Sequence, residues 1–139
     1  MKEEDVPSVV AIERTSFPLP WSEISFFNEV HKERSMPKVA LLDEAVVGYI
    51  CAESVADEGH ILNLGVHPAY RRRGIAAALV EDIVGELKAR GCRFLYLEVR
   101  ASNSAARRLY TGFGFTVTGM RKNYYLAPNE DALIMMLKA

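Results

Sequence analysis

The chain has 139 residues, of which 50% are hydrophobic and 25% charged, a composition that excludes disordered and fibrous proteins. Its length is typical of one domain, and we expect a single domain over residues 1–139. The 17 basic and 18 acidic residues leave a net charge of −1, whereas a dedicated nucleic-acid-binding protein usually carries a basic excess. We therefore expect no direct nucleic-acid partner.

The sequence carries no visible signal for export, membrane insertion or metal binding. No apolar run approaches the roughly 20 residues of a membrane-spanning helix, and no secretory signal stands at the start. Cys51 and Cys92 form no Cys-x-x-Cys motif, so we expect two free buried thiols and no metal. These observations predict a cytoplasmic protein without membrane contact.

The beginning of the chain predicts two helices. Residues 4–16 carry an apolar helical stripe behind an acidic start. Pro18 and Pro20 cannot continue this helix, because proline lacks an N–H and restricts the residue before it. Ser22 is then the expected N-terminal cap of a second helix over residues 22–32.

The rest of the chain predicts alternating strands and helices. Strands are expected over residues 39–42, 45–54, 61–66, 94–99, 115–120 and 132–137, and helices over residues 73–90 and from residue 103 or 104 onward. Asp43-Glu44 is a tight hairpin connection, and the strand–helix–strand unit over residues 61–99 favours parallel pairing. The sequence therefore predicts an α/β (α+β) fold, with a mixed, mostly antiparallel central sheet and helices on both faces.

The most informative segment runs from Val66 through a turn into the start of the predicted helix at residue 73. Unpaired N–H groups and the helix dipole at such a start attract anions, and Gly74 allows a ligand to approach the backbone closely. The glycine is not followed by the Lys-Ser/Thr of a Walker loop, and the three glycines of a dinucleotide fingerprint are missing. The residues alone leave two interpretations open: a phosphate site or a solvated, basic helix start.

This segment resembles the acetyl-CoA loop of the GNAT acetyltransferases through the pattern Arg71-x-x-Gly74-x-Ala76. The preceding Leu64-Gly65-Val66-His67-Pro68 resembles the bulged fourth strand of that family, and Asn103-x-x-Ala106-x-x-Leu109-Tyr110 resembles its last-helix motif. The resemblance extends from about residue 4 to the end, and it implies acetyl-CoA as cosubstrate. It also implies the residues that bind acetyl-CoA: Leu64, Gly65, Val66, Arg71, Arg72, Arg73, Gly74, Ile75, Ala76, Ala77, Asn103 and Tyr110.

A closer resemblance is to the ribosomal-protein-alanine N-acetyltransferases of the RimI type. It is carried by Pro20-Trp21-Ser22-Glu23, by Leu97-Glu98-Val99-Arg100-Ala101-Ser102-Asn103 and by Arg121-Lys122-Asn123-Tyr124-Tyr125. The resemblance implies that the acceptor is the N-terminal alanine of a small-subunit ribosomal protein. One departure is that members of this family normally begin with a short strand, whereas no strand is predicted here before Glu4. We expect this departure to affect local stability more than chemistry.

Two ionisable side chains are candidates for catalysis. Glu98 interrupts an apolar strand, where burial would raise its pKa toward the working range, unless the side chain faces solvent. Tyr110 lies on the apolar stripe of the last predicted helix, a position more typical of the hydrophobic core. The resemblance implies that Glu98 is the general base, acting through water, and that Tyr110 is the general acid. It also implies that the Val66 N–H polarises the thioester carbonyl.

Three aromatic residues are candidates for substrate binding. Trp21, Tyr124 and Tyr125 match positions where the family places the acceptor slot, although aromatic residues packed on the sheet would explain them equally well. His31, His60 and His67 show no spacing that suggests a metal site or a catalytic triad, so we interpret all three as structural.

Three other functions remain compatible with parts of the sequence. A GNAT enzyme for a small amine or a lysine side chain would share the acetyl-CoA motifs, but it is not expected to carry the aromatic residues named above. A non-catalytic acetyl-CoA-binding module would not need both Glu98 and Tyr110. A nucleotide-binding domain would need a magnesium-binding Ser or Thr after Gly74, which the sequence lacks.

Overall fold

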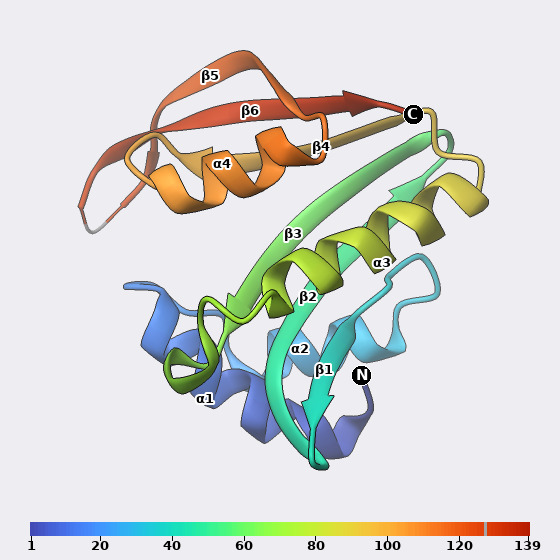
Figure 1. Ribbon diagram of the computed structural model, residues 1–139, viewed down its shortest axis with the longest axis vertical. Helices are drawn as coiled ribbons and strands as arrows, with labels where there is room; N and C mark the ends of the chain where they lie inside the picture. The colour runs from blue at the N-terminus through green and yellow to red at the C-terminus, as the bar shows by residue number, and fades with distance from the viewer. Residues whose placement is uncertain (127) are drawn as a thin grey trace.

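Within residues 1–126 and 128–139, the part of the chain that this computed structural model describes, six strands form a twisted sheet flanked by four helices (Figure 1). The helices are α1 (Val6–Ser16), α2 (Glu23–His31), α3 (Ile75–Ala89) and α4 (Ser104–Gly112). The strands are β1 (Lys38–Leu42), β2 (Ala45–Val55), β3 (Glu58–Val66), β4 (Phe94–Arg100), β5 (Thr116–Tyr125) and β6 (Glu130–Lys138). Short 3-10 turns, η1 (Glu3–Asp5) and η2 (Pro68–Tyr70), precede α1 and α3.

The strand order confirms the predicted sheet. The order is β1-β2-β3-β4-β6-β5, so β1 and β5 are the outer strands. β3 and β4 are parallel, because α3 carries the chain back across the sheet between them, and the other neighbours are antiparallel. The described residues contain no strand ahead of α1.

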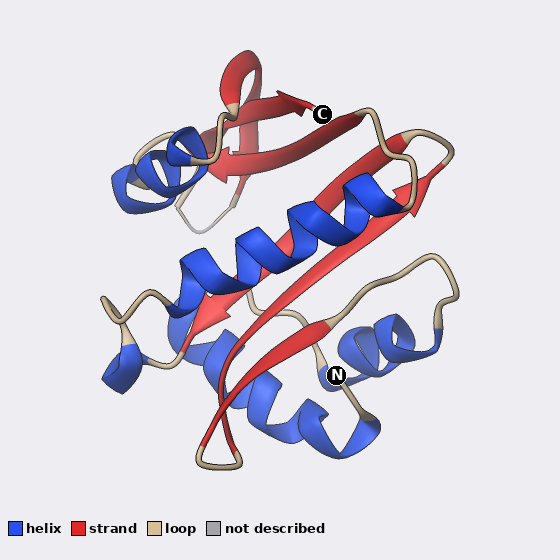
Figure 2. Cartoon of the chain, turned by 45° about the vertical axis from the view of Figure 1, so that its right-hand side comes forward, coloured by secondary structure: helices blue, strands red, loops and turns tan. Residues whose placement is uncertain are grey.

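Different helices cover the two faces of the sheet (Figure 2). On β2, Ile50 and Ala52 pack against the side of α3 and α4, whereas Tyr49 and Cys51 pack against α1 and α2. This division follows from the two-residue period of a strand, whose successive side chains point to opposite faces. Helices therefore cover both faces, as predicted, and Cys51 and Cys92 are free, buried thiols.

Local capping explains most of the helix boundaries. The Ser25 N–H donates a hydrogen bond to Ser22 Oγ at 3.1 Å, which caps α2 as expected. α3 begins at Ile75, two residues later than predicted, because Arg72 and Gly74 take positive φ angles of 65° and 79° and extend the preceding turn. α3 ends just before Gly91, whose φ of 90° favours glycine.

Two strands are longer than their apolar residues predicted. β3 begins at Glu58 rather than at residue 61, because the turn after β2 is confined to two residues. β5 continues to Tyr125 rather than ending near residue 120, although most of its residues are exposed. An outer strand needs only the hydrogen bonds of its neighbour, here β6, and no apolar alternation. Tyr124 therefore belongs to a strand and not to a loop.

A bulge in β3 ends its pairing with β4 near the middle of the sheet. The register against β2 shifts between Cys51 and Ala52, which leaves Leu62 as the extra residue on β3. β3 pairs with β4 only over residues 58–61, and beyond the bulge it remains paired with β2 alone. The two parallel strands diverge from this point, as Figure 1 shows, and the diverging ends create the space for the site described next.

Candidate active site

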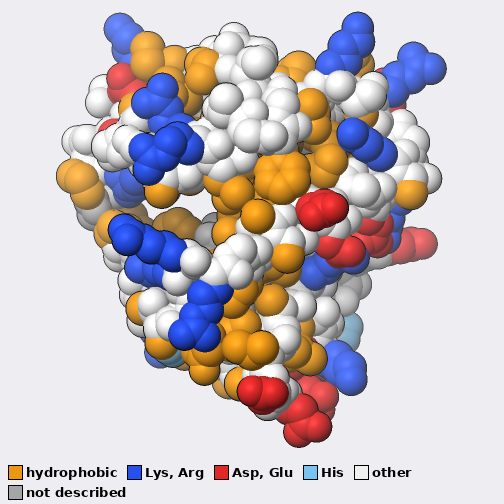
Figure 3. Space-filling model, in the orientation of Figure 1, with side chains coloured by type: hydrophobic (Ala, Val, Ile, Leu, Met, Phe, Trp, Pro, Cys, Tyr) orange, Lys and Arg blue, Asp and Glu red, His pale blue; other side chains and the backbone are white. Residues whose placement is uncertain are grey.

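A cleft of about 840 Å³ opens where β3 and β4 diverge. Its walls come from both faces of the sheet, since Tyr110 and Ala106 of α4 line it together with Glu98 of β4 and Trp21 of the α1–α2 connection. The predicted site residues that line this cleft are Trp21, Leu64, Glu98, Asn103, Tyr110, Tyr124 and Tyr125. Figure 3 shows a hollow on the left of the molecule, with Lys and Arg side chains at its upper and lower edges.

Glu98 is held in the cleft by two basic side chains. Its Oε2 lies 2.7 Å from Nε2 of His60 on β3, and its Oε1 lies 3.8 Å from Nη2 of Arg121 on β5. The Glu98 side chain is only 10% exposed, so the carboxylate reaches the cleft but is largely dehydrated. The solvent-facing alternative is therefore wrong.

The expectation that burial raises the Glu98 pKa is also wrong. The hydrogen bond with His60 lowers the pKa of Glu98, and it outweighs the opposing effect of burial. The charges of His60 and Arg121 lower this pKa further. Because these partners are far from Glu98 in sequence, the strand pattern alone could not predict them. The result is an ionised carboxylate at neutral pH, which attracts an ammonium group and can accept its proton.

Tyr110 reaches the cleft from the opposite face of the sheet. Its ring packs edge-on against Phe115 with 5.7 Å between centroids, and the residue is 6% exposed. Burial raises the pKa of Tyr110, which keeps the hydroxyl protonated. No side chain or backbone group among the described residues makes a hydrogen bond to this hydroxyl. Tyr110 is therefore a core residue that also lines the cleft, with its hydroxyl in the protonated form.

The start of α3 has the features of an anion site. The first bond of the helix joins the Ala78 N–H to the Gly74 carbonyl at 3.0 Å, so the three preceding N–H groups have no partner within the helix. Gly74 is the cap residue, and no side chain bonds to this helix end. A Cβ atom at Gly74 would meet nothing within 4 Å, which leaves open space beside the unpaired N–H groups. These features fit the pyrophosphate of acetyl-CoA.

The three arginines before Gly74 differ in their surroundings. Arg71 donates from Nε to the Val66 carbonyl and from Nη2 to Ser16 Oγ, both at 3.3 Å, so it ties the turn to the end of α1. The Arg73 guanidinium lies over the Tyr70 ring at 5.3 Å. Arg71 therefore has a structural role here that the motif did not reveal.

Two other predicted acetyl-CoA residues also have structural partners. The Ala106 N–H donates to Asn103 Oδ1 at 3.1 Å, so Asn103 caps α4 while it lines the cleft. A Cβ at Gly65 would come within 2.6 Å of the Tyr49 ring. The glycine at position 65 is thus required by the packing of Tyr49 beneath β3.

A buried carboxylate, which sequence reasoning missed, holds the other wall of the cleft. Glu13 on α1 is 1% exposed and accepts hydrogen bonds from the Tyr49 hydroxyl, from Asn63 Nδ2 at 3.0 Å and from the Trp21 N–H at 2.8 Å. These bonds fasten the α1–α2 connection to β2 and β3. The sequence signal that could have revealed Glu13 was its place on the apolar stripe of a helix, since a buried charged residue needs hydrogen-bond partners.

The predicted aromatic residues meet at the mouth of the cleft. Trp21 is half-buried against Phe26, with ring centroids 5.2 Å apart. Tyr124 and Tyr125 form an edge-on pair at 5.1 Å, and the Arg100 guanidinium lies 4.5 Å from the Tyr125 ring. The structure thus brings together residues from the α1–α2 connection and from the β5–β6 hairpin.

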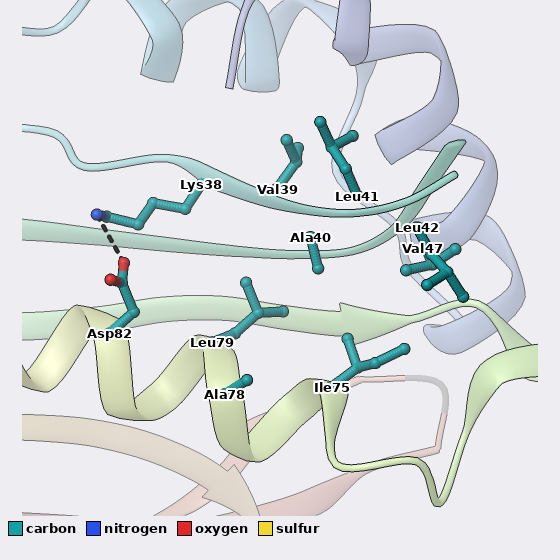
Figure 4. A pocket seen from close by; sticks show the side chains of 10 residues that line it. All are labelled: Lys38, Val39, Ala40, Leu41, Leu42, Val47, Ile75, Ala78, Leu79 and Asp82. Atoms are coloured by element: carbon teal, nitrogen blue, oxygen red, sulfur yellow. Dashed lines mark ion pairs between the residues drawn. The ribbon is translucent and has the colours of Figure 1, made fainter. Parts of the chain in front are cut away.

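A second groove, of about 460 Å³, lies between β1 and α3 (Figure 4). Leu79 and Ile75 line it, and Lys38 closes one end through ion pairs with Asp82 at 2.7 Å and Glu86 at 2.5 Å. Ile75 is the one predicted site residue among the described residues that line it. Neither catalytic candidate is near this groove.

The other two histidines lie outside the cleft. His31 pairs with Glu3 at 2.7 Å, and His67 Nδ1 accepts a hydrogen bond from the Ala69 N–H at 3.0 Å. Among the residues that the structure describes, no three His, Cys, Asp or Glu side chains come together as a metal site. None of the helices in that part of the chain is long and apolar enough to cross a membrane.

Comparison with known proteins identifies the family of this chain. Residues 6–115 match the model of the acetyltransferase (GNAT) family. A ribosomal protein bS18-alanine N-acetyltransferase of Salmonella typhimurium is 38% identical over 135 residues, which cover 96% of this chain and 90% of that protein. The crystal structure of the ribosomal-protein-S18-alanine N-acetyltransferase from Escherichia coli has a TM-score of 0.92 at 36% identity, covering 99% of this chain and 90% of that one. The crystal structure of the NatC complex bound to Gag peptide and CoA has a TM-score of 0.85 at 26% identity, covering 99% of this chain and 92% of that one. From its motifs, its fold and these relatives, the chain belongs to the GNAT family of acetyltransferases.

Proposed function

We propose that this enzyme transfers an acetyl group from acetyl-CoA to the N-terminal amine of a protein, with the N-terminal alanine of a ribosomal protein as the acceptor. The observation that carries this proposal is the cleft between β3 and β4, which is lined by Glu98 from one face of the sheet and Tyr110 from the other. The relatives named for an alanine N-acetyltransferase activity support the choice of acceptor. Both reactants are available in the cytoplasm, where we expect the enzyme to work.

The donor is assigned to the α3 side of the cleft. The unpaired N–H groups of residues 75–77, with Gly74 and the exposed Arg72, are proposed to hold the pyrophosphate. The end of β3, residues 64–66, is proposed to hold the pantetheine arm, because its β4 side has no strand partner. When bound there, acetyl-CoA supplies a thioester whose carbonyl carbon accepts the amine and whose thiol leaves.

The acceptor is assigned to the opposite mouth of the cleft. Trp21, Tyr124 and Tyr125 are proposed to flank an extended N-terminal peptide. The Glu13 hydrogen bonds fix the position of the Trp21 backbone, and the contact with Arg100 restricts the Tyr125 ring. A wall that is already ordered lowers the entropy cost of peptide binding.

The proposed chemistry uses the two ionisable side chains in sequence. Glu98 takes one proton from the acceptor ammonium, directly or through a water, which frees the lone pair that forms the C–N bond. As the C–S bond breaks, its electron pair remains on sulfur, and the sulfur takes the proton of the Tyr110 hydroxyl. The second nitrogen proton restores that hydroxyl, and Glu98 returns its proton to solvent.

A peptide series tests the proposal. Purified enzyme with acetyl-CoA should acetylate a short peptide that begins with alanine, measured by thiol release and by the mass of the product. The same peptide with a blocked N-terminus and one internal lysine is the matched control, and it should remain unmodified. Acetylation of the lysine peptide at a rate equal to that of the alanine peptide would instead indicate a side-chain acetyltransferase.

A further inference from the structure

His60 is a titratable side chain in the cleft to which sequence reasoning gave no chemical role. It lies opposite Tyr96 in the parallel pairing of β3 with β4, and the two rings stack with centroids 4.3 Å apart. Glu98 is two residues beyond Tyr96 and therefore points to the same face of the sheet. The stacking fixes the plane of the imidazole and directs Nε2 at the Glu98 carboxylate, 2.7 Å away.

Several other charged or titratable groups surround this pair. On the elements packed against it they are Glu13 of α1, Glu53 of β2, Glu58 of β3, Tyr96 of β4, and Arg121 and Tyr125 of β5. Glu53 stands directly across from His60 in the antiparallel register, but its carboxylate is engaged by Arg34 at 3.3 Å. Glu13 is occupied by its three donors. The Glu98 carboxylate is therefore the acid that contacts His60 directly.

We propose that His60 is a positioning residue for the acetyl transfer, which it controls through Glu98. A neutral His60 donates its Nε2–H to Oε2 of Glu98, and the carboxylate, with Arg121 at 3.8 Å from Oε1, remains ionised and able to take the proton of the acceptor ammonium. A protonated His60 places a full positive charge against the carboxylate, which then becomes a poor proton acceptor. We therefore expect the acidic limb of the pH–rate profile to depend on His60 and not on Glu98 alone. This inference rests on the proposed role of Glu98 as the base.

Two substitutions of His60 separate the effect of its hydrogen bond to Glu98 from the effect of its protonation. His60→Gln retains an N–H donor of similar reach but does not titrate, so kcat on its plateau should stay within about threefold of the parent. The acidic limb of its pH–rate profile should move to lower pH by more than about one unit. His60→Leu removes the donor, and kcat should fall about tenfold or more while KM for acetyl-CoA changes little. His31→Gln, on the exposed face of α2, is the matched control and should change neither quantity.

The pH profile of His60→Gln decides the outcome. An acidic limb that coincides with that of the parent would overturn the proposal, because a purely structural histidine can be replaced without moving the limb. Thermal unfolding of each variant identifies a folding defect. If His60→Leu does not fold, His60→Gln alone carries the kinetic test.

A second measurement does not depend on the acceptor. The imidazole resonances of His60 can be followed by NMR from about pH 5 to about pH 9 in the parent and in Glu98→Gln. The variant lacks the negative charge that stabilises the imidazolium, so the midpoint of the titration should move to lower pH. An unchanged midpoint would overturn the inference whether or not the enzyme acts on alanine peptides. A shifted midpoint together with no acetylation of any peptide would count against the proposed function alone.

Discussion

Glu98 and Tyr110 occupy contrasting environments that suit opposite directions of proton transfer. The contacts with His60 and Arg121 hold the carboxylate of Glu98 in its ionised form, whereas burial against Phe115 holds the phenol of Tyr110 in its protonated form. A site whose two groups have their pKa values pushed apart contains a ready acceptor and a ready donor. The direction of each shift follows from the neighbours and not from the residue type.

Replacement of Glu98 by Gln tests the acceptor. Glu98→Gln keeps the shape of the side chain and removes the proton acceptor, so kcat should fall by about 10²-fold or more. Affinity for acetyl-CoA, measured by calorimetry, should remain near that of the parent. Glu81→Gln on the exposed surface of α3 removes the same charge far from the cleft and should leave kcat unchanged. A Glu98→Gln enzyme as active as the parent across the pH range would remove Glu98 from the mechanism.

Replacement of Tyr110 by Phe tests the donor. Tyr110→Phe keeps the ring that packs against Phe115, so the melting temperature should change little. Loss of the hydroxyl should lower CoA release at saturating substrates by about 10²-fold, or by less if a water protonates the sulfur instead. A fully active Tyr110→Phe would leave this tyrosine with a packing role only.

At the scale of elements, the bulge in β3 and the turn before α3 act together. The bulge at Leu62 ends the pairing with β4 and opens the cleft, and the turn with its two positive φ angles sets where the unpaired start of α3 begins. Arg71, which lies in this turn, donates hydrogen bonds to the last carbonyl of β3 and to Ser16 at the end of α1. One turn therefore fixes the start of α3 relative to both β3 and α1.

The proposed pyrophosphate site at the start of α3 can be tested with a matched control at the end of the same helix. Gly74 and Gly91 flank the same helix with φ angles of 79° and 90°, and a Cβ at either position meets nothing within 4 Å. Glutamate at either position should therefore cost a similar backbone strain, about 1–2 kcal/mol. Only Gly74→Glu places a carboxylate on the proposed pyrophosphate site, so it alone should weaken acetyl-CoA binding, by about tenfold or more. Equal binding by both variants in calorimetry would place the pyrophosphate elsewhere.

For the whole molecule, the element order and the sheet class followed from sequence periodicity and turn residues. The divergence of β3 and β4 did not follow from periodicity, because a bulge depends on the register between two strands; only the resemblance of residues 64–68 to a bulged strand of the family pointed to it. The same limit applies to the site. Glu98 and Tyr110 were proposed from motifs, whereas the contact with His60 and the hydrogen bonds of Glu13 join distant parts of the chain. Interactions between distant residues also reversed the expected direction of the Glu98 pKa shift.

The architecture of the cleft predicts direct transfer between two substrates bound together. The donor is proposed at the end of β3 and the start of α3 and the acceptor beside Trp21, Tyr124 and Tyr125, so the two proposed sites do not overlap and both substrates can be bound at once. Neither Cys51 nor Cys92 lines the cleft, and no cysteine is therefore placed to carry the acetyl group as a covalent intermediate. Initial rates measured at several fixed peptide concentrations should give intersecting double-reciprocal lines against acetyl-CoA. Intact-mass spectra of enzyme incubated with acetyl-CoA alone should show no acetylated protein. Parallel lines together with an acetylated enzyme would instead establish a ping-pong route through a covalent acetyl-enzyme.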